Sequence, residues 1–121
     1  IRKHGKFERG FLGIEPRSLT EELGKELGLP LNDDMTTYQL NGAYVFRVTE
    51  KSPAAAAGIQ SGDVILNWGG RVVRDASELY NLIGNTEIGT EATVRIFRDG
   101  ETHELSAVLE GFDEWQRKLR R

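Results

Sequence analysis

The sequence contains no cysteine, which excludes disulfide bonds, thiolate zinc sites and a cysteine nucleophile. No segment approaches the roughly 18 apolar residues that span a bilayer, and no basic stretch followed by an apolar core opens the chain as in a signal peptide. An excess of positive charge is lacking as well, because 16 basic and 19 acidic residues leave a formal charge of −3. We therefore expect no nucleic-acid partner, since the chain has no positive field to gather one.

The composition describes a single globular domain. Of 121 residues, 38% are hydrophobic and 29% are charged, a balance typical of a chain that folds around one core. The first residue is Ile1 rather than Met, so we expect a segment of a longer protein. Residues 1–9 are polar and basic without apolar periodicity, which predicts a linker from an upstream domain.

The first third of the chain predicts a short strand, a helix and a loop. Residues 10–14, Gly-Phe-Leu-Gly-Ile, suggest a loop that turns into a strand. Pro16 keeps this strand short or at a sheet edge, because proline donates no ladder hydrogen bond. Leucines at four-residue spacing predict a helix that begins at Ser18 or Thr20 and ends near Glu26. Residues 30–42 are expected to form a polar, irregular loop.

The rest of the chain alternates short strands with two helical segments. Residues 52–58, Ser-Pro-Ala-Ala-Ala-Ala-Gly, carry an N-cap, a proline at the first helical position and a glycine stop. A longer helix is predicted from Asp75 or Ser77 to Ile83, where Gly84 ends it. Asp99-Gly100 predicts a two-residue hairpin turn. Strands are predicted over residues 43–48, 64–68, 71–73, 93–98 and 102–109, giving five or six short strands in all.

No catalytic constellation is apparent. His4 and His103 lie far apart in sequence, no serine stands in a Gly-x-Ser-x-Gly elbow, and His103-Glu104 is not continued to a second histidine. The glycine-rich segments lack the lysine and hydroxyl residue of a phosphate loop. We therefore expect no catalytic residue, no cofactor and no metal in this chain.

The segment from Phe11 to Ile14 is the strongest candidate for a binding site. Successive backbone N–H groups in a glycine-containing loop make a site for an anion, and a free peptide C-terminus is an anion that can lie at the head of an added strand. Leu12 and Ile14 flank Gly13 and can line an apolar pocket for the last side chain, while Arg9 can add charge through water. A simple strand entry is the alternative interpretation of this segment.

The order of the elements resembles a PDZ domain over residues 9–109. More narrowly, it is similar to the PDZ domain that follows the protease domain in trypsin-like serine proteases of the HtrA (Do, DegP-like) family. Residues 9–14, Arg-Gly-Phe-Leu-Gly-Ile, match that family's Arg-Gly-x-Leu-Gly-Ile, and a helix follows the first strand. The stretch from Ser52 to Ile65 is the most specific part of the resemblance.

This resemblance implies a fold and domain boundaries. The expected fold is α+β, a PDZ-like, partly open antiparallel β-barrel or sandwich of five to six strands capped by two helices. It is circularly permuted relative to animal PDZ domains, so that the strand around residues 104–109 takes the place of their first. The expected boundaries are a linker from an upstream protease domain at 1–9, the PDZ domain at 10–110, and a C-terminal tail or linker at 111–121.

The resemblance also implies a function. The groove would capture the C-terminus of substrate or regulatory peptides, or of unfolded protein segments, with an apolar last residue. Because the Gly-Asn-Ser-Gly-Gly motif is absent, this chain is expected not to be an enzyme, while its parent is a trypsin-like serine endopeptidase of the bacterial periplasm or cell envelope. The implied carboxylate-binding loop consists of Arg9, Phe11, Leu12, Gly13 and Ile14, and the implied groove and pocket consist of Leu12, Ile14, Leu79, Leu82 and Ile83.

Several alternatives stay open, among them an enzyme whose site the known motifs do not identify. The parent is alternatively a membrane-associated or C-terminal processing protease, whose PDZ domains have similar glycine signatures. The groove is alternatively non-functional, with the surface serving only interaction or oligomerisation. In the basic C-terminal segment, Trp115 and Leu119 share one helical face, so a membrane or partner contact is the alternative to a solvated tail.

Overall fold

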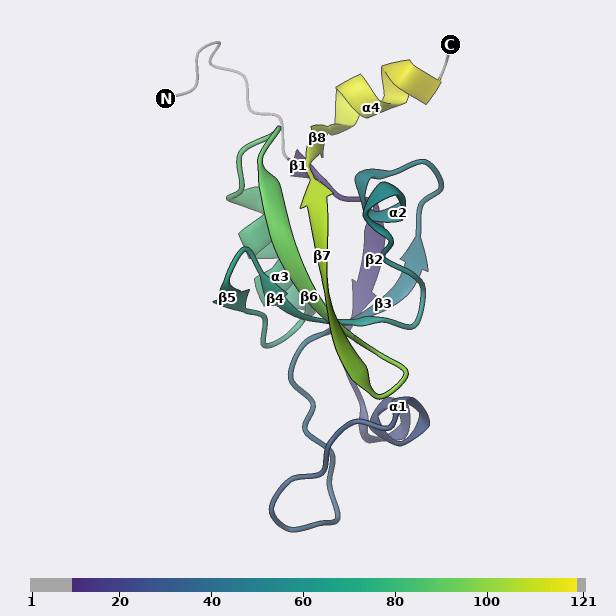
Figure 1. The fold of residues 1–121 in the computed structure, drawn as a ribbon, viewed down its shortest axis with the longest axis vertical. Coiled ribbons are helices and arrows are strands. Elements are labelled where there is room, and N and C mark those ends of the chain that lie inside the picture. The colour runs from purple at the N-terminus through teal and green to yellow at the C-terminus, as the bar shows by residue number, and fades with distance from the viewer. Residues whose placement is uncertain (1–9, 120–121) are drawn as a thin grey trace.

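The computed structural model describes residues 10–119, which form an open antiparallel sheet with helices around it (Figure 1). The main sheet has the strand order β2-β3-β4-β6-β7, with β5 paired to β4, and β1 pairs with β8 in a separate two-stranded sheet. The strands are β1 (Gly10–Phe11), β2 (Ile14–Arg17), β3 (Ala43–Val48), β4 (Val64–Trp68), β5 (Arg71–Val72), β6 (Glu91–Arg98), β7 (Glu101–Val108) and β8 (Glu110–Gly111). β2 and β7 form the two edges of the main sheet. The sheet is therefore not closed into a barrel, which confirms the expected PDZ-like fold class.

Three helices begin at capping residues that the sequence predicts. Thr20 Oγ1 caps α1 (Glu21–Leu27) by accepting a hydrogen bond from the Leu23 amide, Ser52 Oγ caps α2 (Pro53–Ala57), and the Asp75 carboxylate caps α3 (Ala76–Gly84). The alternatives Ser18 and Ser77 are not the caps. Gly84 is the last residue of α3 rather than the residue that follows it, and Asn85 is the C-cap.

The Asp99-Gly100 hairpin turn is confirmed. Both residues have positive φ, 52° and 81°, and they connect two antiparallel strands of eight residues each. Positive φ at both central positions is what a two-residue turn needs to match the twist of the strands. The hairpin contributes Ala92, Val94, Ile96 and Ala107 to the buried core.

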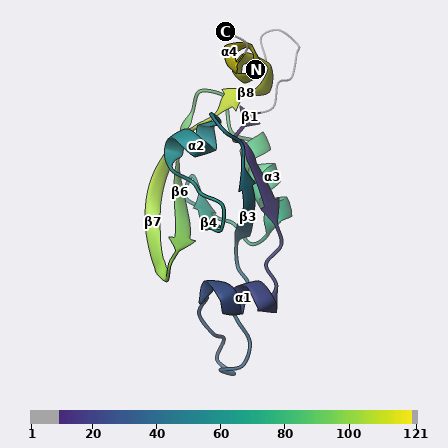
Figure 2. The same ribbon diagram turned by 90° about the vertical axis from the view of Figure 1, so that its right-hand side faces the viewer.

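The core lies between the sheet, α2 and α3. Ile65, Leu79 and Ile96 are among its largest fully buried side chains, and α3 runs alongside β2 and β3 (Figure 2). One ion pair is largely inside the protein: the buried Asp63 carboxylate accepts hydrogen bonds from Arg98 Nε and Nη2 at 2.8 and 2.7 Å. The core therefore fixes the position of α3 beside the edge strand β2.

The loop between α1 and β3 extends beyond the end of the sheet (Figure 1). Leu31 and Tyr38 form an isolated bridge across it. At its turn, the backbone amides of Thr36 and Thr37 donate to Asp34 Oδ1, which holds the pKa of Asp34 at about 2. Side-chain and backbone hydrogen bonds therefore order a segment that the sequence predicts to be irregular.

The C-terminal segment forms a helix, α4 (Phe112–Leu119). It lies within residues 111–121, for which the sequence predicts a tail or linker. Among residues 10–119, no helix is long and apolar enough to cross a membrane.

Candidate functional site

A mainly apolar groove lies between the edge strand β2 and helix α3. Its volume is about 550 Å³. It is lined by Gly10, Phe11, Leu12, Gly13, Ile14, Pro16, Tyr80, Ile83, Gly84 and Phe112. None of these lining residues has a charged side chain, so the donors that the described lining offers to an anion are main-chain N–H groups and the Tyr80 hydroxyl.

One side of β2 is unpaired along this groove. Within residues 10–119, β2 pairs only with β3, and the register shifts between Glu15 and Pro16, leaving Phe46 of β3 without a partner in β2. Proline is tolerated in strands at edges and bulges, because its nitrogen donates no hydrogen bond. The position of Pro16 therefore agrees with the predicted short edge strand.

The direction of the main-chain groups in the loop before β2 follows from two hydrogen bonds. The Leu12 carbonyl accepts from the Ala54 amide and the Gly13 carbonyl accepts from the Thr49 amide, both at 2.8 Å. All peptide bonds of the described chain are trans, so each N–H points opposite to the preceding carbonyl. The Gly13 N–H therefore points away from α2, and the Ile14 N–H points away from Thr49, toward the unpaired side of β2.

Gly13 is required by two features of this loop. Its φ is +92°, a conformation that residues with a side chain rarely adopt. A Cβ atom added at this position would lie 2.2 Å from Ser52 Cβ, so the N-cap of α2 occupies that space. The loop and α2 are therefore packed as one unit.

Gly10 allows a similar close approach at the other end of the loop. A Cβ atom here would lie 2.7 Å from Leu109 Cδ1 and 3.5 Å from the Ile83 carbonyl oxygen. The end of α3 therefore sits directly against β1, which fixes the width of the groove at this end.

The structure brings together most of the predicted site residues. Phe11, Leu12, Gly13, Ile14 and Ile83 all line the groove. Ile14 is half-buried, whereas the side chains of Leu12 and Ile83 are nearly covered, with residue exposures of 3% and 8%. Both residues therefore contribute to the core as well as to the groove wall.

Two predicted pocket residues do not line the groove, and one lies outside the described residues. Leu79 is fully buried in the core, because its side of α3 faces the sheet. Leu82 lines a different hollow, on the other side of α3. Helical spacing alone does not decide which of these leucines and Ile83 faces the groove, because the helix packs on two sides. Arg9 falls in the segment that precedes the described residues.

Five groove-lining residues were missed by sequence reasoning: Gly10, Pro16, Tyr80, Gly84 and Phe112. Two of them, Tyr80 and Phe112, are aromatic. Tyr80 is 53% exposed and precedes Ile83 by three positions on α3. This i, i+3 spacing was the signal that could have identified it. Phe112 is contributed by α4, and its only signal in the sequence was an aromatic side chain in a largely polar segment.

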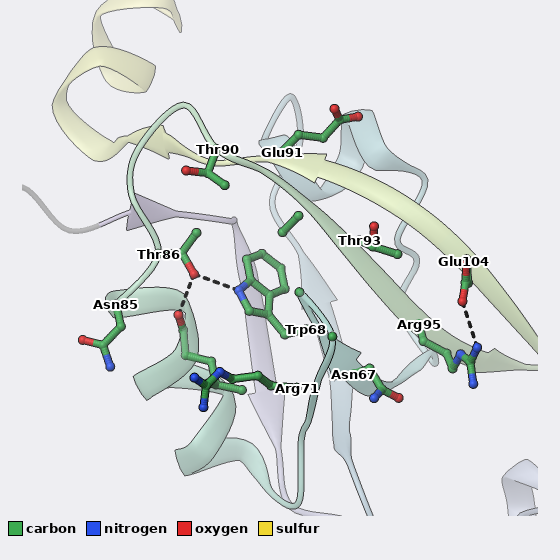
Figure 3. A pocket seen from close by; sticks show the side chains of 14 residues that line it. Asn67, Trp68, Arg71, Asn85, Thr86, Thr90, Glu91, Thr93, Arg95 and Glu104 are labelled. Carbon is green, nitrogen blue, oxygen red and sulfur yellow. Dashed lines mark hydrogen bonds and ion pairs between the residues drawn. The ribbon is translucent and has the colours of Figure 1, made fainter.

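The hollow that contains Leu82 is larger, about 910 Å³, and more polar (Figure 3). At its centre, the Trp68 indole N–H donates to Thr86 Oγ1 at 2.9 Å, and Thr86 Oγ1 donates to the Leu82 carbonyl at 2.7 Å. The indole N–H of the buried Trp68 therefore already has a hydrogen-bond partner within the protein. This hollow is a weaker candidate for ligand binding than the groove.

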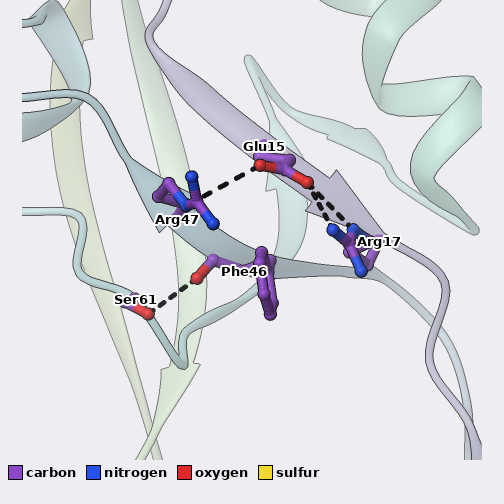
Figure 4. Close-up of polar contacts among 5 residues, drawn as sticks. All are labelled: Glu15, Arg17, Phe46, Arg47 and Ser61. Carbon is purple, nitrogen blue, oxygen red and sulfur yellow. Dashed lines mark hydrogen bonds and ion pairs between the residues drawn. The ribbon is translucent and has the colours of Figure 1, made fainter.

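The outer face of β2 and β3 carries a charged cluster next to the unpaired edge (Figure 4). The Arg17 guanidinium donates two hydrogen bonds to the Glu15 carboxylate, which lowers the pKa of Glu15. Arg17 also lies 4.0 Å from the centre of the Phe46 ring, and Arg47 is 3.9 Å from Glu15. The groove thus has an apolar inner wall and a charged outer rim.

Comparison with known proteins identifies relatives of the same architecture. The family model described as PDZ domain matches residues 10–109. The "Probable periplasmic serine endoprotease DegP-like" of Rickettsia prowazekii is 36% identical over 105 residues, which cover 87% of this chain and 19% of that protein. The protein of the same name from Marinomonas sp. is 31% identical over 110 residues, covering 91% and 22%. The chain therefore spans about a fifth of the length of these curated relatives.

Solved structures give the same result. The HtrA-type protease AlgW with a decapeptide superposes with a TM-score of 0.75 at 30% identity, covering 89% of this chain and 31% of that one. The HtrA3 PDZ domain bound to the phage-derived ligand FGRWV superposes with a TM-score of 0.66 at 27% identity, covering 84% and 86%. The similarity to AlgW covers only part of that longer chain, whereas the similarity to HtrA3 covers most of an isolated domain.

Proposed function

The chain belongs to the PDZ domain family, in the form found in HtrA-type and DegP-like proteases, and from this premise we propose that its groove binds the free C-terminus of a peptide. One observation carries the proposal: the loop that precedes β2 directs its Ile14 amide to an unpaired strand edge beside an apolar hollow. An anion, a strand and an apolar side chain can all be accommodated at this point.

The proposed ligand adds as a strand along β2. Its terminal carboxylate accepts hydrogen bonds from the amides of the Leu12–Ile14 loop, which replace the water that solvates it in the free peptide. Its last side chain enters the hollow next to Ile14 and Ile83. Because all described lining residues are uncharged, we expect an apolar last residue.

Alternation along a strand assigns the neighbouring peptide side chains. If the last side chain points to α3, the one before it points to the outer face of β2. That face carries Glu15 and Arg17. We therefore expect tolerance of polar or charged residues at the position before the last.

The role of the domain in its parent is the second part of the proposal. The relatives are named periplasmic serine endoproteases, whereas this chain lacks the family's serine motif. We infer that the domain recruits substrates or senses regulatory peptides for an attached trypsin-like protease domain in the bacterial periplasm or envelope. Peptide bond cleavage itself would be performed by that other domain.

The test compares free acids with amides. Ten pentapeptides are prepared from the FGRWV ligand of the HtrA3 domain, ending in Val, Ile, Leu, Phe or Ala, each with a free carboxylate and as the amide. Calorimetry measures their affinity for the isolated chain. We expect the acids to bind about 10- to 100-fold more tightly, because an amide leaves charge-assisted hydrogen bonds unmade. Absence of binding by all five acids, or equal affinity of acid and amide, would refute the proposal.

A further inference from the structure

Helix α4 contributes to the groove although it lies beyond the residues that match the family. The match ends at residue 109, and α4 begins at Phe112. Phe112 lines the groove together with Ile14 and Ile83. It is 43% exposed, so much of this residue remains free to contact a ligand.

Three aromatic rings hold α4 against the loop that precedes β2. The ring centres of Phe11 and Phe112 are 5.2 Å apart, in an edge-to-face arrangement with an interplanar angle of 74°. Trp115 lies 4.5 Å from Phe11 and 5.8 Å from Phe112. Aromatic pairs at such distances contribute packing energy beyond their buried area. Phe112 is therefore held by two ring contacts.

Trp115 also ties α4 to the rest of the domain. It is only 8% exposed, and its indole N–H donates to the Lys51 carbonyl at 2.8 Å. Lys51 directly precedes Ser52, the residue whose Cβ lies against Gly13. The segment that supports the loop thus also anchors the helix.

Main-chain pairing fixes where α4 starts. Gly10 pairs with Gly111 and Phe11 with Glu110, so the first residue of the helix follows directly from a strand paired to the loop. An ion pair between Lys118 and Glu110 joins the last turn of α4 to the same strand. Phe112 is consequently held at the loop end of the groove, where the last residue of a bound peptide would lie.

We propose that α4 forms part of the ligand site, with Phe112 as a specificity-determining wall for the last side chain of the peptide and Trp115 as its positioning residue. This inference rests on the proposed function. A large last side chain reaches the Phe112 ring, whereas alanine is too short to cover it. The domain would therefore select the size of the last residue with a side chain that lies beyond the residues matched by the family model.

The experiment measures size preference with the acid peptides FGRWF, FGRWV and FGRWA. We expect Phe112→Ala to weaken FGRWF about 5- to 20-fold and FGRWA less than about twofold, because only the larger side chain loses apolar contact. Phe112→Leu should retain an intermediate preference. Leu119→Ala is the matched control, since this residue is on the same helix, is 44% exposed and does not line the groove; it should leave all affinities unchanged.

A positioning role for Trp115 predicts the same pattern for a second variant. Trp115→Ala should reduce the ratio of FGRWF to FGRWA affinity as Phe112→Ala does, and the double variant should add little. A merely structural role would weaken both peptides by the same factor. If the wild-type chain binds the acids selectively but Phe112→Ala keeps its size preference, or loses affinity for all peptides equally, the inference about α4 is wrong while the proposed function stands. If no acid binds the wild-type chain, the proposed function itself fails.

Discussion

Replacing Gly13 by alanine should destabilise the loop before β2, the proposed carboxylate site, through two separate contributions. The first is conformational, because φ at this position is +92°. An L-residue with a Cβ atom in the left-handed region costs about 1–2 kcal/mol. The second is steric, because the new methyl group would lie 2.2 Å from Ser52 Cβ, well inside van der Waals contact.

The steric contribution lowers the free energy of unfolding further. The closest clash is with Ser52 Cβ, whose position is set by the main chain, so rotation of the side chain cannot relieve it. Ser52 is also buried as the N-cap of α2. Overpacking of this kind costs about 1–3 kcal/mol, and relief requires the loop to move. Together the two contributions amount to about 2–5 kcal/mol in the free energy of unfolding. A shifted loop also misdirects the Ile14 amide, so peptide affinity should fall by more than about tenfold.

Two further variants separate these contributions. Gly62 has nearly the same φ, +98°, with no atom within 4 Å of an added Cβ, so Gly62→Ala should cost only the conformational part. The double variant Gly13→Ala with Ser52→Gly removes the obstructing side chain while glycine still serves as an N-cap at a cost of a few tenths of a kcal/mol. It should therefore recover most of the steric part.

Chemical denaturation measures the free energies, and calorimetry with FGRWV measures binding. The reasoning is refuted if Gly13→Ala is no more destabilising than Gly62→Ala, since the contact with Ser52 would then have no energetic consequence. It is also refuted if the Ser52→Gly change does not improve the Gly13→Ala variant.

Two predictions concern charged groups away from the groove. Arg98→Met should lower the free energy of unfolding by about 3–5 kcal/mol in chemical denaturation, because it leaves the buried Asp63 carboxylate without its cation. The control Arg95→Met breaks an exposed ion pair and should cost about 1 kcal/mol or less. Equal costs for the two variants would contradict the burial of the Asp63–Arg98 pair. Hydrogen bonds from the two backbone amides at positions 36 and 37 hold the pKa of Asp34 at about 2, so its stabilising contribution is present above about pH 4 and is lost as the pH falls toward 2. NMR titration of the carboxyl carbon should show this midpoint, and Thr37→Val should raise it; an Asp34 midpoint near 4 in the wild-type chain would contradict the turn geometry.

The parts of the fold that depend on neighbouring residues were predictable from the sequence. Ser52, Asp75 and the Asp99-Gly100 turn act through hydrogen bonds or dihedral preferences within a few residues, so their chemistry can be identified without knowing the tertiary structure. The segment from Phe11 to Ile14 was predicted for the same reason. Its glycine indicates a loop, and the apolar residues on either side of the glycine indicate the lining of a pocket.

The parts that depend on distant partners were not predictable. Leu79 and Ile83 both have aliphatic side chains and lie four residues apart on α3. Only the packing of α3 against the sheet places Leu79 in the core and Ile83 at the groove. The contact between Phe11 and Phe112 joins opposite ends of the described chain, and no local pattern encodes it. The sequence indicated a helical face shared by Trp115 and Leu119. It did not indicate that the Trp115 indole N–H donates to the Lys51 carbonyl.

The unpaired side of β2 has a consequence for solubility as well as for recognition. An exposed strand edge is a template on which further copies of a chain can add, and natural proteins shorten or interrupt such edges to prevent sheet growth. Amides two residues apart point to the same side of a strand, so the position after Ile14 that would extend the ladder is Pro16, which has no N–H. The edge therefore offers too few donors for a long intruding strand, while the last residues of a chain can still pair beside the loop. Pro16 thus protects the domain against open-ended addition of strands at this edge.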